Sequence, residues 1–191
     1  MTQPIHDSLL ARMRETEQMP GLSVLDHGLL VADHFRDLAD HVRTGAPLRF
    51  AWKLPDWVRD PRLWARLPAD ETLERYQTFH DCGKPSCLVL GEDGRRHFPD
   101  HARVSKEVWL SLGECPEVAE LIGMDMDVHL LKDEGVAEFA ARPQAAALVL
   151  TGLAEIHANA GLFGGIESTS FRIKYKQIDR RGKAILARWP A

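Results

Sequence analysis

The sequence predicts a helical protein. Two observations support this fold class: apolar residues recur with helical spacing in several segments, and Pro or Gly residues separate those segments. The longest patterns run from residue 23 to 42 and from 144 to 159. Pro99 and Pro143 mark helix starts, because a proline cannot continue a helix from the preceding turn.

The N-terminal part predicts a short helix from 5 to 18, ended by Pro20 and Gly21. Ser23 is suited to cap the next helix, because its hydroxyl can accept a hydrogen bond from a free backbone N–H. Along that helix His27, His34 and His41 are seven residues apart and share one stripe. We interpret the second and third histidines as packing or solvent-facing residues.

Residues 44–71 contain four prolines and three tryptophans, which rules out a long regular helix. Two interpretations remain open. The segment is either an irregular connection whose tryptophans pack on the core, or a lid in which one tryptophan stacks on a base.

Further helices are predicted at 71–79, from about residue 100 to 112, at 117–122 and at 144–159. The chain then continues through a Gly-rich loop at 161–170. Its last segment fits a helix, but residues 171–176 also alternate as a strand would, so a short β-hairpin is the alternative.

The composition fits one domain over residues 1–191, with a core at about 22–160 and a C-terminal segment at 161–191. Hydrophobic residues make up 45% and charged residues 27%, which is ordinary for a soluble protein. We expect a cytoplasmic location, because no apolar run could span a bilayer and the N-terminus lacks a signal-peptide pattern. Three unpaired cysteines predict neither disulfides nor a structural zinc site.

The net charge of −4 argues against a generally basic nucleic-acid binder. The charge is uneven, since residues 168–191 carry seven basic side chains and one acidic one. That segment therefore carries +6 and the remainder −10. A basic segment near a metal site would favour a phosphate-bearing substrate.

His80 and Asp81 place an imidazole and a carboxylate on adjacent residues. One divalent cation can bind both groups if the backbone turns to aim them together. Gly83 and Pro85 favour such a turn, and Lys84 adds a positive charge close by.

Together with His27 upstream and His101 and His129 downstream, this pattern resembles the HD-domain family of metal-dependent phosphohydrolases. Residues 98–105, Phe-Pro-Asp-His-Ala-Arg-Val-Ser, are similar to the family phrase Phe-Pro-x-His-x-x-x-Ser. The resemblance covers about residues 22–160. It implies an all-α bundle whose metal ligands converge on a central cleft.

The resemblance implies a set of metal ligands made of His27, His80, Asp81, His101 and His129. The family also has a late Asp ligand, but no Asp occurs here between residues 133 and 179. Glu155 is the acid on the polar stripe of the 144–159 helix, and we expect it to replace that Asp. Asp125 and Asp127 either orient His129 as acceptors or are solvated.

Imidazole and carboxylate ligands suit one or two ions of Mn, Fe, Ni, Co or Zn, with Mg as a further candidate. With two ions, Asp81 would bridge them. Asp81 and Lys84 are the expected catalytic residues. The residues expected to contact a substrate phosphate are Lys84, Arg103, Ser168, Ser170 and Lys174. The loop before Ser168 is alternatively a plain turn followed by a helix cap.

The resemblance thus implies hydrolysis of a phosphate ester in a nucleotide or a nucleic-acid end, by a metal-activated water. The expected partners are a phosphorylated small molecule or an RNA end, with no membrane. The alternative is a catalytically silent HD-type regulatory module that binds a nucleotide or RNA.

Overall fold

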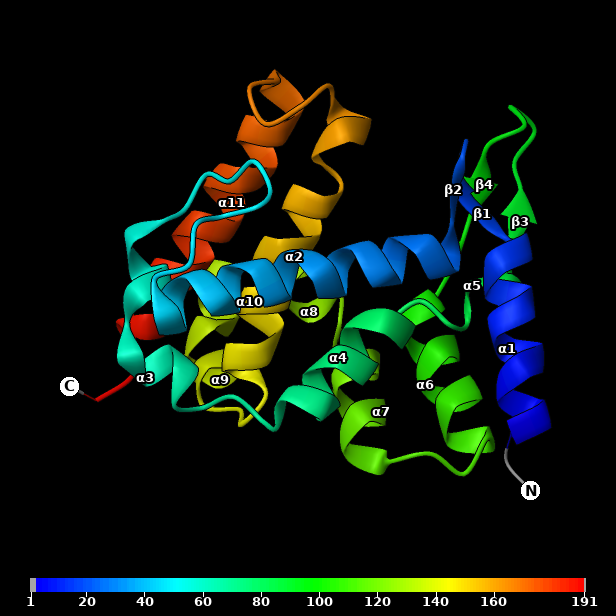
Figure 1. Cartoon of the computed structure of the whole chain (residues 1–191), viewed down its shortest axis with the longest axis horizontal. Helices are drawn as coiled ribbons and strands as arrows, with labels where there is room; N and C mark the ends of the chain where they lie inside the picture. The colour runs from blue at the N-terminus through cyan, green and yellow to red at the C-terminus, as the bar shows by residue number, and fades with distance from the viewer. Residues whose placement is uncertain (1–2, 191) are drawn as a thin grey trace. The chain divides into compact units, whose positions relative to one another are not determined.

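The computed structural model describes residues 3–190 and is mostly helical, which confirms the all-α prediction (Figure 1). Within these residues, β-structure is confined to two short antiparallel pairs. β1 (Glu17–Met19) pairs with β2 (Leu22–Ser23), and β3 (Val89–Leu90) pairs with β4 (Arg96–His97). No helix in the described part of the chain combines the length and apolar character needed to cross a bilayer.

The chain divides into two compact units. The first unit contains Met1–Leu30 and Glu71–Asp125, and the second contains Val31–Asp70 and Met126–Ala191. The long helix α2 (Val24–Thr44) contributes its first residues to the first unit and its remainder to the second. The grouping of all residues into one domain stays a prediction.

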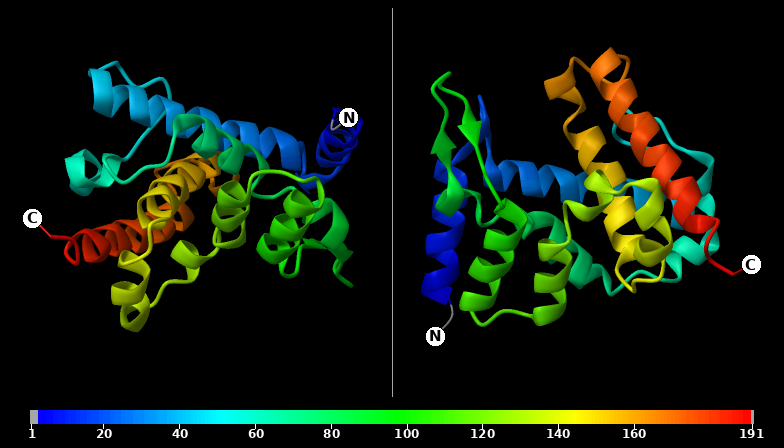
Figure 2. Two further views of the ribbon diagram at one scale, coloured as in Figure 1. Left: turned by 90° about the horizontal axis from the view of Figure 1, so that it is seen from below. Right: turned by 180° about the vertical axis from the view of Figure 1, so that it is seen from behind.

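The first unit consists of the N-terminal helix, the start of α2 and a run of helices after residue 70. Ser23 caps α2 as predicted, because its Oγ accepts a hydrogen bond from the Asp26 N–H at 3.0 Å. α6 and α7 pack side by side (Figures 1 and 2). Trp109, in α6, is fully buried. The helices of this unit are α1 (Gln3–Glu15), α4 (Asp70–Phe79), α5 (Lys84–Cys87), α6 (His101–Ser111) and α7 (Pro116–Gly123).

The second unit is built around α10, in which every residue except Glu155 is buried. α11 packs along α10 (Figure 2). Its remaining elements are short. The elements of this unit are η1 (Asp56–Arg59), α3 (Pro61–Trp64), α8 (Asp127–Leu130), η2 (Asp133–Gly135), α9 (Val136–Ala140), α10 (Ala145–Ala158), η3 (Ala160–Phe163) and α11 (Thr169–Leu186).

The C-terminal segment forms the helix α11, and the alternative of a β-hairpin is wrong. Ser168 is the N-cap, since its Oγ accepts from the Phe171 N–H at 3.1 Å. Phe171, Ile178 and Ile185 are buried at seven-residue spacing. This helical period therefore overrides the short alternation at residues 171–176.

The proline-rich segment is an irregular connection, as one of its two interpretations predicted, and its tryptophans are held by packing and hydrogen bonds. Trp52 donates from Nε1 to Asp37, Trp57 donates to Asp179, and Trp64 donates to the carbonyl of Val58. All of these contacts lie within the second unit. They disfavour a lid that offers a free indole for base stacking.

A buried carboxylate organises the chain that follows α2. Asp37 is 2% exposed and accepts hydrogen bonds from the backbone N–H groups of Arg49 and Phe50 at 2.9 and 3.1 Å. It also accepts from Trp52 Nε1 at 2.9 Å. Burial raises the pKa of Asp37, but these bonds together lower it below its usual range. The loop is thus ordered without regular secondary structure.

A buried imidazole also fixes the backbone of this loop at residue 53. His157 donates from Nδ1 to the Leu153 carbonyl at 2.8 Å, because a carbonyl can only accept. Its Nε2 therefore accepts the Lys53 N–H at 3.1 Å. The ring packs on Trp52, with centroids 4.4 Å apart. Burial lowers the pKa of His157 to about 4, so the ring is neutral at neutral pH.

This geometry predicts a pH-dependent stability. Between pH 6.5 and about 4 an unfolded His157 binds a proton that the folded protein does not. Stability is therefore full above pH 6.5 and falls through this window, by roughly 3 kcal/mol for a shift of this size. We expect urea unfolding to show a flatter dependence in His157→Gln, while the exposed control His97→Gln keeps the wild-type slope. Identical slopes in both variants would contradict this account.

Candidate metal centre

The His80-Asp81 pair lies in a tight turn directly after α4. The Cys82 N–H donates to the Phe79 carbonyl at 3.0 Å, and the Lys84 N–H donates to the Asp81 carbonyl at 2.9 Å. These bonds reverse the chain and direct both side chains to the interior, where each is 1% exposed. The turn predicted from Gly83 and Pro85 is therefore confirmed.

Two glycines let backbone segments approach closely at this turn. A Cβ atom added to Gly28 would overlap the carbonyl of Thr78, and one added to Gly83 would overlap the backbone of Ser105. The Gly83 N–H also donates to Ser105 Oγ at 2.9 Å. These approaches fix α2 against the end of α4 and α6 against the turn, which brings His27 to His80.

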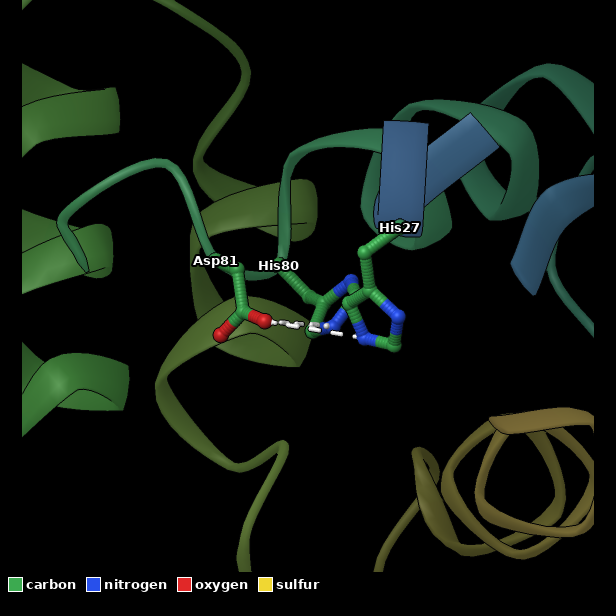
Figure 3. A group of neighbouring side chains, drawn as sticks. All are labelled: His27, His80 and Asp81. Atoms are coloured by element: carbon green, nitrogen blue, oxygen red, sulfur yellow. Dashed lines mark ion pairs between the residues drawn. The ribbon is translucent and has the colours of Figure 1, made fainter. Parts of the chain in front are cut away.

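Three side chains that can bind a metal converge here: His27 from α2, and His80 and Asp81 from the turn (Figure 3). One ligand atom from each lies within 4.8 Å of the other two. The Nε2 atoms of His80 and His27 are 3.2 and 3.7 Å from Asp81 Oδ2. All three residues are buried and belong to the first unit.

These separations fit a shared ion. Two ligand atoms that each lie about 2.1 Å from one ion are about 3.0 Å apart at a right angle and about 3.4 Å apart at the tetrahedral angle. The distances of 3.2 and 3.7 Å from the two imidazoles to Asp81 Oδ2 lie within a few tenths of an ångström of these values. In addition, Asp81 Oδ1 is buried and accepts no hydrogen bond from any residue in 3–190. An under-satisfied buried carboxylate oxygen is well suited to a cation.

The electrostatic surroundings of Asp81 favour its charged form. Burial alone would raise the pKa of Asp81. The positive charge of Lys84 and the charge and hydrogen bond of His80 outweigh that effect, so the pKa lies well below its usual range. By contrast, burial and the nearby Asp81 charge raise the pKa of Cys82 to about 12, so its thiol stays protonated at neutral pH.

Two histidines present Nε2 towards Asp81 because Nδ1 is occupied. His80 donates from Nδ1 to the Gln77 carbonyl at 2.7 Å. His101 donates from Nδ1 to the Phe98 carbonyl at 3.1 Å, and its Nε2 lies 3.7 Å from Asp81 Oδ1. Such a second hydrogen bond is typical of metal-binding histidines, because it fixes the tautomer and the ring orientation. His101 therefore faces the second oxygen of the carboxylate.

Lys84 compensates the buried charge of Asp81 at Oδ2, the oxygen that His27 and His80 also face. Its Nζ lies 2.6 Å from Asp81 Oδ2 and donates to Gln18 Oε1 at 3.0 Å. Gln18, in β1, was not predicted as part of the site. A single glutamine near a predicted helix end gives no sequence signal for this contact. Gly83, in contrast, marks the turn beside Asp81 in the sequence.

His129 and Glu155 lie in the second unit and contact each other, with Nε2 and Oε2 2.8 Å apart. Glu155 is therefore the acceptor that orients His129. The acids considered for that role have other partners: Asp125 accepts from Tyr76 and Asp127 from Arg142, each at 2.6 Å. That His129 and Glu155 join the same metal site stays a prediction.

Among the residues expected to contact a substrate phosphate, Arg103, Ser170 and Lys174 are exposed and Ser168 is half-buried. Arg103 donates to Glu107 at 2.6 Å, and Lys174 lies 5.0 Å from the centre of the Phe163 ring. The hydroxyl of Ser168 caps α11, and Ser170 lies in the first turn of that helix. Their role towards a phosphate stays a prediction.

Comparisons with known proteins give no assignment. No family model matches the sequence, and no curated protein matches it significantly. The function is therefore inferred from the geometry of the site and from the resemblance in its motifs.

The close approach at Gly28 predicts an unusual sign for a glycine substitution. In a helix, Gly→Ala normally stabilises by about 0.5–1 kcal/mol. Gly28→Ala should instead destabilise by about 2 kcal/mol, because the added methyl group meets the Thr78 carbonyl. Gly161→Ala is the control, since a Cβ at Gly161 meets nothing within 4 Å. Urea unfolding measures both changes, and a stabilised Gly28→Ala would contradict the close approach.

Lys84 Nζ contacts the carboxylate oxygen that a metal bound here would use, which predicts opposite effects of Lys84→Met on stability and on metal affinity. Without metal, the variant leaves Asp81 uncompensated and should lose about 3 kcal/mol of stability. Its affinity for Mn²⁺ should rise about tenfold, because a competing positive charge is gone.

Calorimetric titration with Mn²⁺ measures the affinity, and thermal unfolding with and without Mn²⁺ measures the stability. Lys106→Met is the control, because it removes an ion pair with Glu120 elsewhere in the first unit. A lower Mn²⁺ affinity in Lys84→Met would contradict competition for Asp81.

Proposed function

We propose that this protein is a metal-dependent phosphohydrolase of the HD type, which cleaves a phosphate ester of a nucleotide or of a nucleic-acid end. The observation that carries the proposal is the buried group of His27, His80 and Asp81, whose ligand atoms lie within 4.8 Å of one another. Buried charges are paired with opposite charges or coordinate metals, and a buried carboxylate that faces two imidazoles is therefore suited to a cation.

The donor set is suited to a divalent transition metal, with two nitrogens and one anionic oxygen. His27, His80 and Asp81 would hold a first ion, and His101, whose Nε2 lies 3.7 Å from Asp81 Oδ1, would help to hold a second. When bound, such an ion lowers the pKa of a coordinated water and offsets charge on phosphoryl oxygens.

The chain itself supplies the surrounding positive charge and orientation. Lys84 Nζ lies beside Asp81 and can contact a phosphoryl oxygen, which gains negative charge as the ester is cleaved. The Gln77 and Phe98 carbonyls hold the rings of His80 and His101 in the tautomer that leaves Nε2 unprotonated in the neutral ring. Arg103 is the exposed cation proposed to receive the rest of the substrate.

Metal analysis and a hydrolysis screen test the proposal together. We expect the wild type to retain Mn, Fe, Ni, Co or Zn, and His80→Ala to lose the metal and about 100-fold or more of the activity. Glu155→Gln should reduce metal content if Glu155 replaces the late Asp of the family. The matched control, His97→Gln, removes an exposed histidine and should change neither quantity.

The screen covers nucleoside mono-, di- and triphosphates, cyclic nucleotides and short RNA ends, each with several divalent ions. Metal binding without hydrolysis of any phosphoester would favour the silent nucleotide- or RNA-binding module. A wild type that binds no metal would contradict the proposed centre itself. Unchanged metal in Glu155→Gln would remove only that residue from the ligand set.

A further inference from the structure

The second unit contains a basic pocket that is separate from the residues assigned to hydrolysis. The pocket has a volume of about 310 Å³ and is lined by Lys53, Arg172, Tyr175 and Lys176. Three of its four lining side chains are cations. We propose that this pocket binds a compact, multiply charged phosphate group of a small molecule.

The charge balance of the pocket favours an anion. Arg172 is paired with Glu167 at 2.6 Å. Within the described residues, the Lys53 and Lys176 ammonium groups have no carboxylate oxygen within 4.0 Å. Glu167 offsets part of the positive charge of the lining, and the charges of Asp56 and Asp179 also act on Tyr175. The positive charge available to a phosphate group is therefore that of the Lys53 and Lys176 ammonium groups.

Lys53 is held in place by buried groups, although its loop has no regular secondary structure. Its backbone N–H donates to the buried Nε2 of His157 at 3.1 Å. The preceding Trp52 packs on the same imidazole and donates to Asp37. Figures 1 and 2 show this loop beside α11, which carries the other three lining residues. A fixed backbone lowers the entropy that a cation loses when it binds a ligand.

The aromatic residue of the pocket already contacts two neighbours. Lys53 Nζ lies 5.4 Å from the centre of the Tyr175 ring, and Phe171 stacks with that ring at a centroid distance of 6.1 Å. A nucleobase that stacks on Tyr175 would compete with these contacts. We infer that the phosphate charge is recognised and that a base adds little.

The neighbouring acids favour a compact ligand over an extended nucleic acid. Glu167 flanks Arg172, and Asp179 lies one turn of α11 beyond Tyr175. A continuous phosphodiester backbone needs a longer track of unpaired cations. A single polyphosphate group needs only the two ammonium groups and the partly neutralised guanidinium.

Calorimetric titration of the metal-free protein with inorganic tripolyphosphate tests the proposal. We expect one site per chain and a loss of affinity of about tenfold or more in the variant Lys53→Gln/Lys176→Gln. The control Lys132→Gln/Lys183→Gln removes two exposed lysines of the same unit that do not line the pocket. This control variant has the same net charge as Lys53→Gln/Lys176→Gln and should still bind tripolyphosphate. Circular dichroism confirms that each variant is folded.

Further titrations separate this proposal from the hydrolytic one, on which it does not rest. His80→Ala should bind tripolyphosphate as the wild type does, and ATP should bind no more tightly than tripolyphosphate. Absence of binding, equal losses in both double variants, or loss in His80→Ala would overturn the pocket. ATP binding tenfold tighter, or tighter binding of single-stranded RNA with increasing length, would overturn the assignment to a compact phosphate group.

Discussion

The buried charge of Asp81 is the constraint on which the proposed centre depends. A carboxylate that is 1% exposed costs several kcal/mol in desolvation unless opposite charge or hydrogen-bond donors surround it. Lys84, His80 and His27 all face its Oδ2, and His101 faces Oδ1. In the absence of a metal, the lysine ammonium at 2.6 Å is the principal counter-charge. A divalent ion would take over that role and release the lysine towards a substrate.

This arrangement requires close contact between backbones as well as suitable side chains. Gly28 and Gly83 let α2, the turn and α6 meet where any other residue would keep them apart. The rings of His80 and His101 are then oriented by hydrogen bonds to the nearby backbone carbonyls of Gln77 and Phe98. Residues with no chemical role thus determine whether the ligands can converge.

The second unit shows the same principle in a loop. The buried carboxylate of Asp37 accepts hydrogen bonds from residues 49, 50 and 52, and Nε2 of the buried His157 accepts one from residue 53. Hydrogen bonds that a helix or strand would otherwise supply come here from side chains. A proline-rich connection can therefore hold Lys53 in a defined place beside α11.

Much of the helical fold could be predicted, because apolar spacing and local caps such as Ser23 are encoded within a few residues. The strand pairs were not predicted, because strands of two or three residues are too short to show an alternating pattern. The C-terminal helix was ambiguous over residues 171–176. At the site, the His80-Asp81 turn has a local signal.

The contacts of Gln18 with Lys84 and of Glu155 with His129 join residues far apart in the chain, so the sequence did not predict them.

The most direct test of the central claim is anomalous X-ray diffraction from crystals of the Mn²⁺-loaded protein. The account predicts an anomalous peak for a Mn²⁺ ion bound by His27 Nε2, His80 Nε2 and Asp81, with the Lys84 ammonium group displaced from Asp81 Oδ2. A peak bound by other residues, or a well-ordered Asp81 still paired with Lys84 at saturating Mn²⁺, would contradict it.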